Sequence, residues 1–252
     1  MKKPHSKKSL SENRCNRMKL RGLLPLSLIE YPGKMVAVVW TGGCNFRCPF
    51  CYNRDLVLNP TSIDPVSEGE VLGLLKRREK WLDGLAITGG EPTIHEDLPE
   101  FIKRVKDLDF LVSIETNGSN LEMLKKLIED ELVDYIALDV KAPLDWDRYK
   151  TVAGMDDKNK FEEVLKSVKL LKEGKVDYEF RTTFVPNLLD GEDIITIAEQ
   201  LKGVKRYALQ QFTPRNTINE KFEKLEPIAQ EELEKIGEKI EDMFQDFRIR
   251  GI

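Results

Sequence analysis

The chain has 252 residues, of which 33% are charged and 40% hydrophobic, which is enough for a folded core. Its formal net charge of −4 gives no indication of a nucleic-acid or membrane partner. No segment reaches the run of about 18 apolar residues that a membrane-spanning helix needs, so we expect none.

The N-terminus differs from the rest in charge. Residues 1–21 carry eight Lys and Arg residues against Glu12 alone, a local net charge of +7. Residues 1–17 contain no apolar run, so we interpret them as a disordered basic tail rather than a signal peptide, or alternatively as an attachment site for an acidic partner. Met18 is an alternative start, and residues 18–252 are expected to form a single domain. Without an export signal, the expected location is the reducing cytoplasm.

Apolar segments with the character of strands alternate with amphipathic, helix-like segments along the chain. The expected strands are residues 35–40, 84–90, 110–118, 134–143, 176–186 and 205–212. The expected helices are residues 67–82, 96–108, 119–131, 158–173, 191–201 and 227–247. This alternation implies an α/β fold with parallel strands joined by right-handed crossovers. Six units are too few for a closed (βα)8 barrel, so we expect a partial (βα)6 TIM-like barrel, or else a doubly wound sheet.

Both architectures place chemistry at the carboxyl ends of the strands. The motifs of the sequence lie there. A cysteine-rich loop follows the first expected strand, TGGEP the second, ETNG the third and DVK the fourth. The sequence therefore predicts a single site at one edge of the sheet.

The cysteine loop contains Cys44, Cys48 and Cys51 in a C-x3-C-x2-C spacing. Three thiolates can hold three irons of a cubane cluster and leave the fourth iron open to a small molecule, whereas an electron-transfer [4Fe–4S] cluster uses four cysteines. A structural zinc site is also closed by four ligands. Its fourth ligand would have to come from Cys15, His5, His95 or a carboxylate.

The C-x3-C-x2-C motif, with Phe50 before its last cysteine, resembles that of the radical S-adenosylmethionine enzymes, and the resemblance extends over roughly residues 20–215. It implies a radical SAM core with a [4Fe–4S] cluster bound by the three cysteines. The open iron would bind the amino and carboxylate groups of S-adenosylmethionine. One electron from the cluster would then cleave that cofactor to a 5′-deoxyadenosyl radical, which abstracts a hydrogen atom. In that family, the backbone near the position of Tyr52 contacts the adenine of the cofactor. The aromatic ring at the position of Phe50 has a packing role.

TGGEP, from Thr88 to Pro92, is similar to the second motif of this superfamily. Gly89 and Gly90 would let the backbone approach a ligand closely, and Glu91 would offer a carboxylate to its ammonium group. The alternative is a plain turn between a strand and a helix.

Glu115 and Asn117 share one face of a strand end, while Thr116 points the other way. The resemblance implies that Glu115 and Asn117 reach the ribose or the amino-acid part of the cofactor. A capped turn built on Gly118 and Ser119 is the alternative.

Asp139 and Lys141 also share one face of a strand, where they either orient cofactor or peptide or form an ion pair inside the barrel. Arg181 lies within an apolar strand and could bind a carboxylate of the cofactor, a partner's backbone or a buried acid. A monovalent cation near Glu115, Thr116 and Asp139 is a further possibility.

The lead-in GLLPLSLIEYPGK before the first expected strand resembles that of the activating proteins of anaerobic ribonucleoside-triphosphate reductases. The substrate would then be a glycine Cα–H of a glycyl radical enzyme, with ferredoxin or flavodoxin as the electron donor. One alternative is a small-molecule enzyme such as a 7-carboxy-7-deazaguanine synthase, whose lead-in normally carries G-E-G. The other is a non-catalytic iron–sulfur or zinc scaffold.

Overall fold

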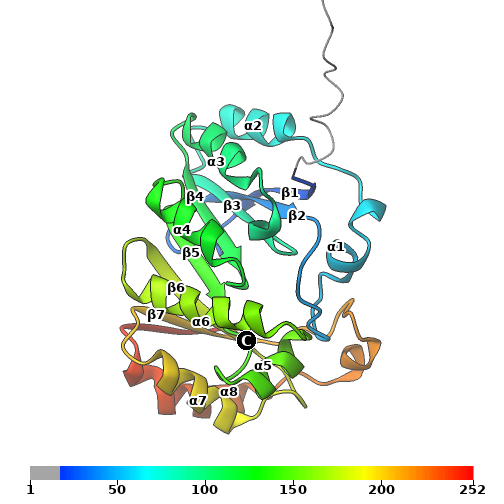
Figure 1. The fold of residues 1–252 in the computed structure, drawn as a ribbon, viewed down its shortest axis with the longest axis vertical. Coiled ribbons are helices and arrows are strands. Elements are labelled where there is room, and N and C mark those ends of the chain that lie inside the picture. The colour runs from blue at the N-terminus through cyan, green and yellow to red at the C-terminus, as the bar shows by residue number, and fades with distance from the viewer. Residues whose placement is uncertain (1–17, 252) are drawn as a thin grey trace, which may run out of the picture.

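The computed structural model describes residues 18–251, so the prediction for the basic tail falls outside the described residues. These residues form one eight-stranded sheet whose strands follow each other in sequence order (Figure 1). Strands β2 to β8 are parallel to one another, and β1 is antiparallel to β2. The strands are β1 Leu20–Ser27, β2 Val36–Thr41, β3 Gly84–Gly89, β4 Leu111–Thr116, β5 Tyr135–Asp139, β6 Asp177–Phe184, β7 Arg206–Gln211 and β8 Asp246–Arg250.

The helices connect consecutive strands, and two of them begin with a capping box. Ser67 and Glu70 form a capping box at the start of α2, and Asp190 and Asp193 form another at α7. The helices are α1 Arg54–Leu58, α2 Glu68–Arg77, α3 Leu98–Lys106, α4 Leu121–Glu129, α5 Trp146–Ala153, α6 Lys158–Lys172, α7 Gly191–Leu201 and α8 Gln230–Ile240. Short 3-10 turns occupy Pro60–Ser62, Pro92–Ile94, Glu220–Lys224 and Glu241–Met243.

The two faces of the sheet differ because side chains alternate along each strand. Val39, Ile87 and Ile114 belong to the large core shared with the helices. Their neighbours Val38 and Ala86 point to the opposite, inner side and form a smaller apolar cluster there. Because the strands run in sequential order with no reversal, the sheet is not doubly wound. The expected partial barrel of parallel strands is confirmed.

Two strands were not predicted, and one predicted helix is shorter than expected. Residues 227–247 were expected to form one helix, but α8 ends at Ile240 and residues 246–250 form the edge strand β8. In β8, Phe247 and Ile249 lie against Gly237 of α8, while Arg250, the next residue, pairs with Glu179 of β6. At the other edge, β1 carries exposed leucines and Pro25, so its sequence does not look like a buried strand. The helix expected from Ser119 begins two residues later, with Asn120 as its cap.

No helix among residues 18–251 is both long and apolar enough to cross a membrane.

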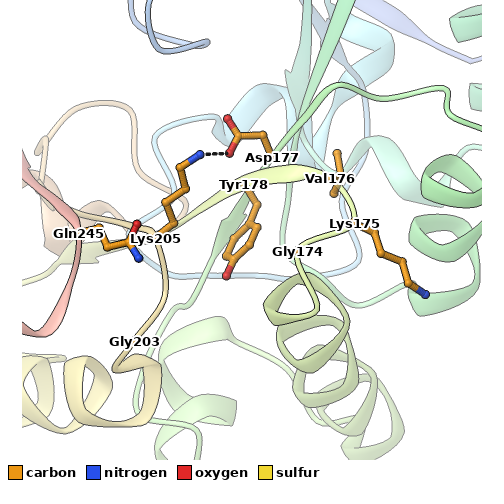
Figure 2. A pocket seen from close by; sticks show the side chains of 8 residues that line it. All are labelled: Gly174, Lys175, Val176, Asp177, Tyr178, Gly203, Lys205 and Gln245. Carbon is orange, nitrogen blue, oxygen red and sulfur yellow. Dashed lines mark hydrogen bonds and ion pairs between the residues drawn. The ribbon is translucent and has the colours of Figure 1, made fainter.

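A hollow of about 440 Å³ lies at the amino ends of β6 and β7, where Asp177 and Lys205 form an ion pair (Figure 2). Gly174 and Gly203 border it from the loops that lead into these strands. The hollow is therefore at the opposite end of the sheet from the cysteine loop, which follows the carboxyl end of β2. It is separate from the site that the motifs predict.

Candidate active site

The three cysteines lie on the loop between β2 and α1, and all three are free thiols. Two segments from later in the chain hold this loop. Cys48 Sγ donates to the carbonyl oxygen of Ala153 at the end of α5, over 3.4 Å. From the segment after β7, Ile218 N donates to Cys51 O over 3.1 Å, and this orange segment lies near the loop in Figure 1. Two later parts of the fold, the end of α5 and the segment after β7, thus hold the loop that carries the thiols.

Burial governs the protonation of these thiols. It raises the pKa of Cys44 to about 11, with Glu91 adding to the effect, and that of Cys48 to about 12. Buried thiols of this kind become thiolates when a positively charged metal centre binds them. Among residues 18–251, no three His, Cys, Asp or Glu side chains are close enough to bind one metal ion directly. Three soft thiols on one loop fit an iron–sulfur cluster.

The glycines of TGGEP bring its loop against the cysteine loop. Gly90 N donates to Thr41 O over 2.9 Å, and Glu91 N donates to Gly43 O over 2.8 Å. A Cβ atom on Gly90 would lie 1.8 Å from Gly43 O, and one on Gly89, whose φ is +125°, would lie 2.3 Å from Thr41 N. The close approach predicted for these glycines is therefore made to the cysteine loop, and whether a ligand also approaches them remains a prediction.

The carboxylate of Glu91 is occupied by the protein itself. It is 1% exposed and accepts hydrogen bonds from Thr116 Oγ1 and Asn117 N, each over 2.7 Å, and from both N and Oγ1 of Thr93. Burial raises its pKa although these donors oppose the shift. Glu91 thus ties the turn after β3 to the turn after β4. The role predicted for it, binding a ligand's ammonium group, stays a prediction.

Asn117 also contacts the cysteine loop. Its Nδ2 lies 2.9 Å from Asn45 Oδ1 and 4.0 Å from Cys44 Sγ. Nothing in the sequence pattern singles out Asn45, because an asparagine between two cysteines of a loop is not distinctive. As predicted, Thr116 points away from Glu115, and it contributes instead to holding Glu91.

Glu115, Asp139, Lys141 and Arg181 meet on the inner side of the barrel. Arg181 lies 2.8 Å from Glu115 and 3.3 Å from Asp139, and Lys141 lies 2.7 Å from Asp139. Burial would lower the pKa of Lys141, but Asp139 and the Cys48 sulfur raise it above its usual value. The ion pair expected as one alternative for Asp139 and Lys141 is present, and their role in orienting cofactor or peptide stays a prediction.

Glu30 is a further inner residue that pattern reasoning did not assign. It belongs to the EYPG lead-in, and burial together with the nearby Glu115 raises its pKa to about 8. Its neighbour Tyr31 stacks on Tyr135 of β5, with ring centroids 4.9 Å apart. The signal that the sequence offered for Glu30 was its position directly before the aromatic residue Tyr31.

The aromatic residues beside the last cysteine differ in environment. Phe50 is buried in the main core, and its contribution to the cofactor site stays a prediction. The side chain of Tyr52 is 57% exposed, which leaves the predicted backbone contact with adenine as a prediction.

An open parallel barrel with three free thiols after its first parallel strand defines an iron–sulfur enzyme that uses S-adenosylmethionine. The chain belongs to the Radical SAM superfamily, whose family model matches residues 38–202. Its enzymes use a [4Fe–4S] cluster and S-adenosylmethionine.

Within that superfamily, the chain is 37% identical over 239 residues to a protein of Methanocaldococcus jannaschii that carries the provisional name glycyl-radical enzyme activating enzyme. The match covers 92% of this chain and 95% of the relative. A protein of Thermococcus kodakarensis, provisionally named GTP 3′,8-cyclase, is 28% identical over 78% of this chain and 64% of its own length.

The fold is similar to the crystal structure of Streptococcus suis SuiB bound to S-adenosylmethionine, with a TM-score of 0.62 and 16% identity. The match covers 83% of this chain but only 48% of that structure. This likeness supports the fold alone.

Proposed function

We propose that this enzyme activates a glycyl radical enzyme by removing a hydrogen atom from a glycine Cα of that partner. The observation that carries the proposal is the 37% identity to a relative of that provisional name over nearly the full length of both chains. The EYPG lead-in, with Glu30 and Tyr31 placed at the inner side of the barrel, is consistent with it.

The cluster and S-adenosylmethionine, when bound, supply a carbon-centred radical that takes a hydrogen atom. In this proposal Cys44, Cys48 and Cys51 hold the cluster. The open barrel admits a peptide loop, and Asp139 and Lys141 orient cofactor or peptide near the cysteines. No general base is needed, because the proton and its electron leave the glycine together.

The charges of the inner side support a neutral substrate over a nucleotide. Arg181 is paired with Glu115 and Asp139, and Lys141 is paired with Asp139. Arg250 makes two contacts of 2.8 Å with Glu179. These three cations are already neutralised, so a triphosphate would have to displace a buried carboxylate to bind them, which is costly. A peptide glycine carries no charge and requires no such exchange.

We further propose that the partner is an anaerobic ribonucleotide reductase and that ferredoxin or flavodoxin is the electron donor. The reaction would take place in the cytoplasm. This proposal rests on the similarity of GLLPLSLIEYPGK to the lead-in of such activating proteins. The second candidate is a small-molecule enzyme, because the chain is also similar to the relative from T. kodakarensis.

The test is anaerobic incubation of the reconstituted enzyme with reductant, S-adenosylmethionine and the anaerobic ribonucleotide reductase of the same organism. We expect a glycyl-type doublet in the electron paramagnetic resonance spectrum, and the Cys48→Ala variant should give none. Active cofactor cleavage without this doublet would reject the reductase as the partner. If GTP then stimulated the cleavage and was consumed, the second candidate would replace the proposal.

A further inference from the structure

Three polar side chains form a closed hydrogen-bonded ring between the cysteine loop and the turn after β4. Asn45 Nδ2 donates to Ser119 Oγ over 2.7 Å, Ser119 Oγ donates to Asn117 Oδ1 over 2.6 Å, and Asn117 Nδ2 donates to Asn45 Oδ1 over 2.9 Å. Each side chain donates once and accepts once within the ring. Turning one amide over would place like atoms against each other, and Ser119 N donates to Asn117 Oδ1 over 3.0 Å, which sets the direction of the whole ring.

The ring is anchored on a rigid turn. Asn117 and Ser119 are only 6% and 4% exposed, so their polar atoms depend on protein partners. Glu91 accepts from Asn117 N over 2.7 Å, and Ser167 of α6 donates to Gly118 O over 2.8 Å. The turn after β4 is therefore held independently of the cysteine loop, and the ring transmits this fixed position to Asn45.

The ring also leaves Asn117 in contact with a cluster ligand. Asn45 directly follows Cys44 in the chain, and the amide of Asn117 lies 4.0 Å from Cys44 Sγ. Phe46 N is the second donor to that sulfur, at 3.4 Å. Hydrogen bonds to the sulfurs of an iron–sulfur cluster stabilise its more negative, reduced form and raise its reduction potential.

We propose that Asn45 is a positioning residue: through Asn117 and Ser119 it fixes the Cys44 arm of the cysteine loop and keeps the Asn117 amide on the Cys44 sulfur. Asn45 need touch neither the cofactor nor the hydrogen donor. The proposal depends on the cluster that the superfamily uses, and it holds whichever substrate the enzyme has.

The first test measures the midpoint potential of the reconstituted cluster for wild type, Asn45→Ala, Asn45→Asp and Ser119→Ala. Asn45→Ala and Ser119→Ala should shift the potential to lower values, because both release the Asn117 amide. Asn45→Asp should shift it further, because a carboxylate beside Cys44 opposes the reduced state. Asn159→Ala, an exposed substitution on α6, is the matched control and should leave the potential unchanged.

The second test needs no cluster, and it applies even if Asn45→Ala fails to assemble one. Alkylation of the three thiols in the metal-free protein is followed by mass spectrometry. Cys44 should react several-fold faster in Asn45→Ala than in wild type, while the rate at Cys48 should not change. A wild-type rate at Cys44 in this variant, or a wild-type potential with a full cluster, would overturn the proposal. An equal acceleration at all three thiols would do so as well, since it would mean that the loop has unfolded.

Discussion

The guanidinium of Arg181 on β6 lies 2.8 Å from the carboxylate of Glu115 on β4, across the strand that separates them. Burial alone would raise the pKa of Glu115, but Arg181 lowers it to about 2, so this carboxylate stays ionised. Both side chains are largely shielded from water, so their charges depend on protein partners, and Asp139, 3.3 Å from Arg181, is a second acid that shares this cation.

Replacing Arg181 should therefore destabilise the fold. Arg181→Ala leaves Glu115 and Asp139 without their shared cation, and breaking a buried pair in this way costs about 3–5 kcal/mol. Urea unfolding under anaerobic conditions measures the change. The matched control is Arg248→Ala, whose side chain is 56% exposed and pairs with Asp246 at the surface, with an expected cost within about 1 kcal/mol. Equal effects of the two substitutions would contradict the buried-pair argument.

The raised pKa of Glu30 gives a second, pH-dependent prediction. Glu30 lies among Glu115, Tyr52, Arg181 and Arg250, and burial is the largest cause of the shift from 4.5 to about 8. Between these values the unfolded chain has lost the proton of Glu30 while the folded chain retains it. The free energy of unfolding should therefore fall as the pH rises from about 4.5 to about 8.

Glu30→Gln should remove this loss, because the amide does not titrate. The variant should gain stability relative to wild type between pH 5 and pH 8, on the order of 1 kcal/mol after allowance for the partial exposure of Glu30. Unfolding curves at several pH values provide the measurement. Glu122→Gln, at an exposed position of α4, should follow the wild type throughout. Parallel curves for wild type and Glu30→Gln would show that Glu30 is not held protonated.

The sequence predicted the parallel part of the barrel because β2 to β7 are apolar runs bounded by helices with recognisable caps. The two edge strands, β1 and β8, were not predicted, and the reasons differ. β1 is half exposed and contains Pro25, whereas β8 alternates charged and apolar residues directly after a helix, a pattern that also fits a longer helix. The stability of an edge strand depends on its neighbour, and the sequence does not show that neighbour.

The candidate site was predictable in its positions but not in its contacts. Motifs at strand ends identified Cys44 and Glu91 because parallel strands bring their carboxyl ends together. The pairing of Arg181 with Glu115 depends on the register of two strands about 65 residues apart, which no local pattern encodes. The occupation of Glu91 by Thr93 and Thr116 likewise depends on how two turns pack.

The packing of TGGEP on the cysteine loop gives a third prediction. In Gly90→Ala the new Cβ would meet Gly43 O at 1.8 Å, and because both atoms belong to backbone the loops would have to separate. Overpacking of this kind costs about 1–3 kcal/mol or more, and here it would also disturb the arm that carries Cys44. Iron content after reconstitution and urea unfolding should both decrease.

Gly69→Ala is the matched control for Gly90→Ala. Gly69 lies within α2, and the nearest atom to its new Cβ is 3.9 Å away. Alanine is the better helix former, so this variant should be as stable as wild type or more stable by up to about 1 kcal/mol, with full iron content. Normal cluster assembly in Gly90→Ala would show that the two loops need not be in contact.

The last prediction concerns the number of cysteine ligands. Cys15 falls outside the described residues, and Cys44, Cys48 and Cys51 are the thiols that the fold brings to the site. If three thiols bind the cluster and the fourth iron is open, Cys15→Ala should retain about four irons per chain and normal cleavage of S-adenosylmethionine. Cys48→Ala should lose both, because it removes one of the three thiols proposed to hold the cluster. Iron analysis, absorption spectra and chromatography of 5′-deoxyadenosine measure these outcomes. Loss of the cluster in Cys15→Ala, or zinc in place of iron in the wild type, would mean that the site is closed by a fourth protein ligand and cannot bind the cofactor through an open iron.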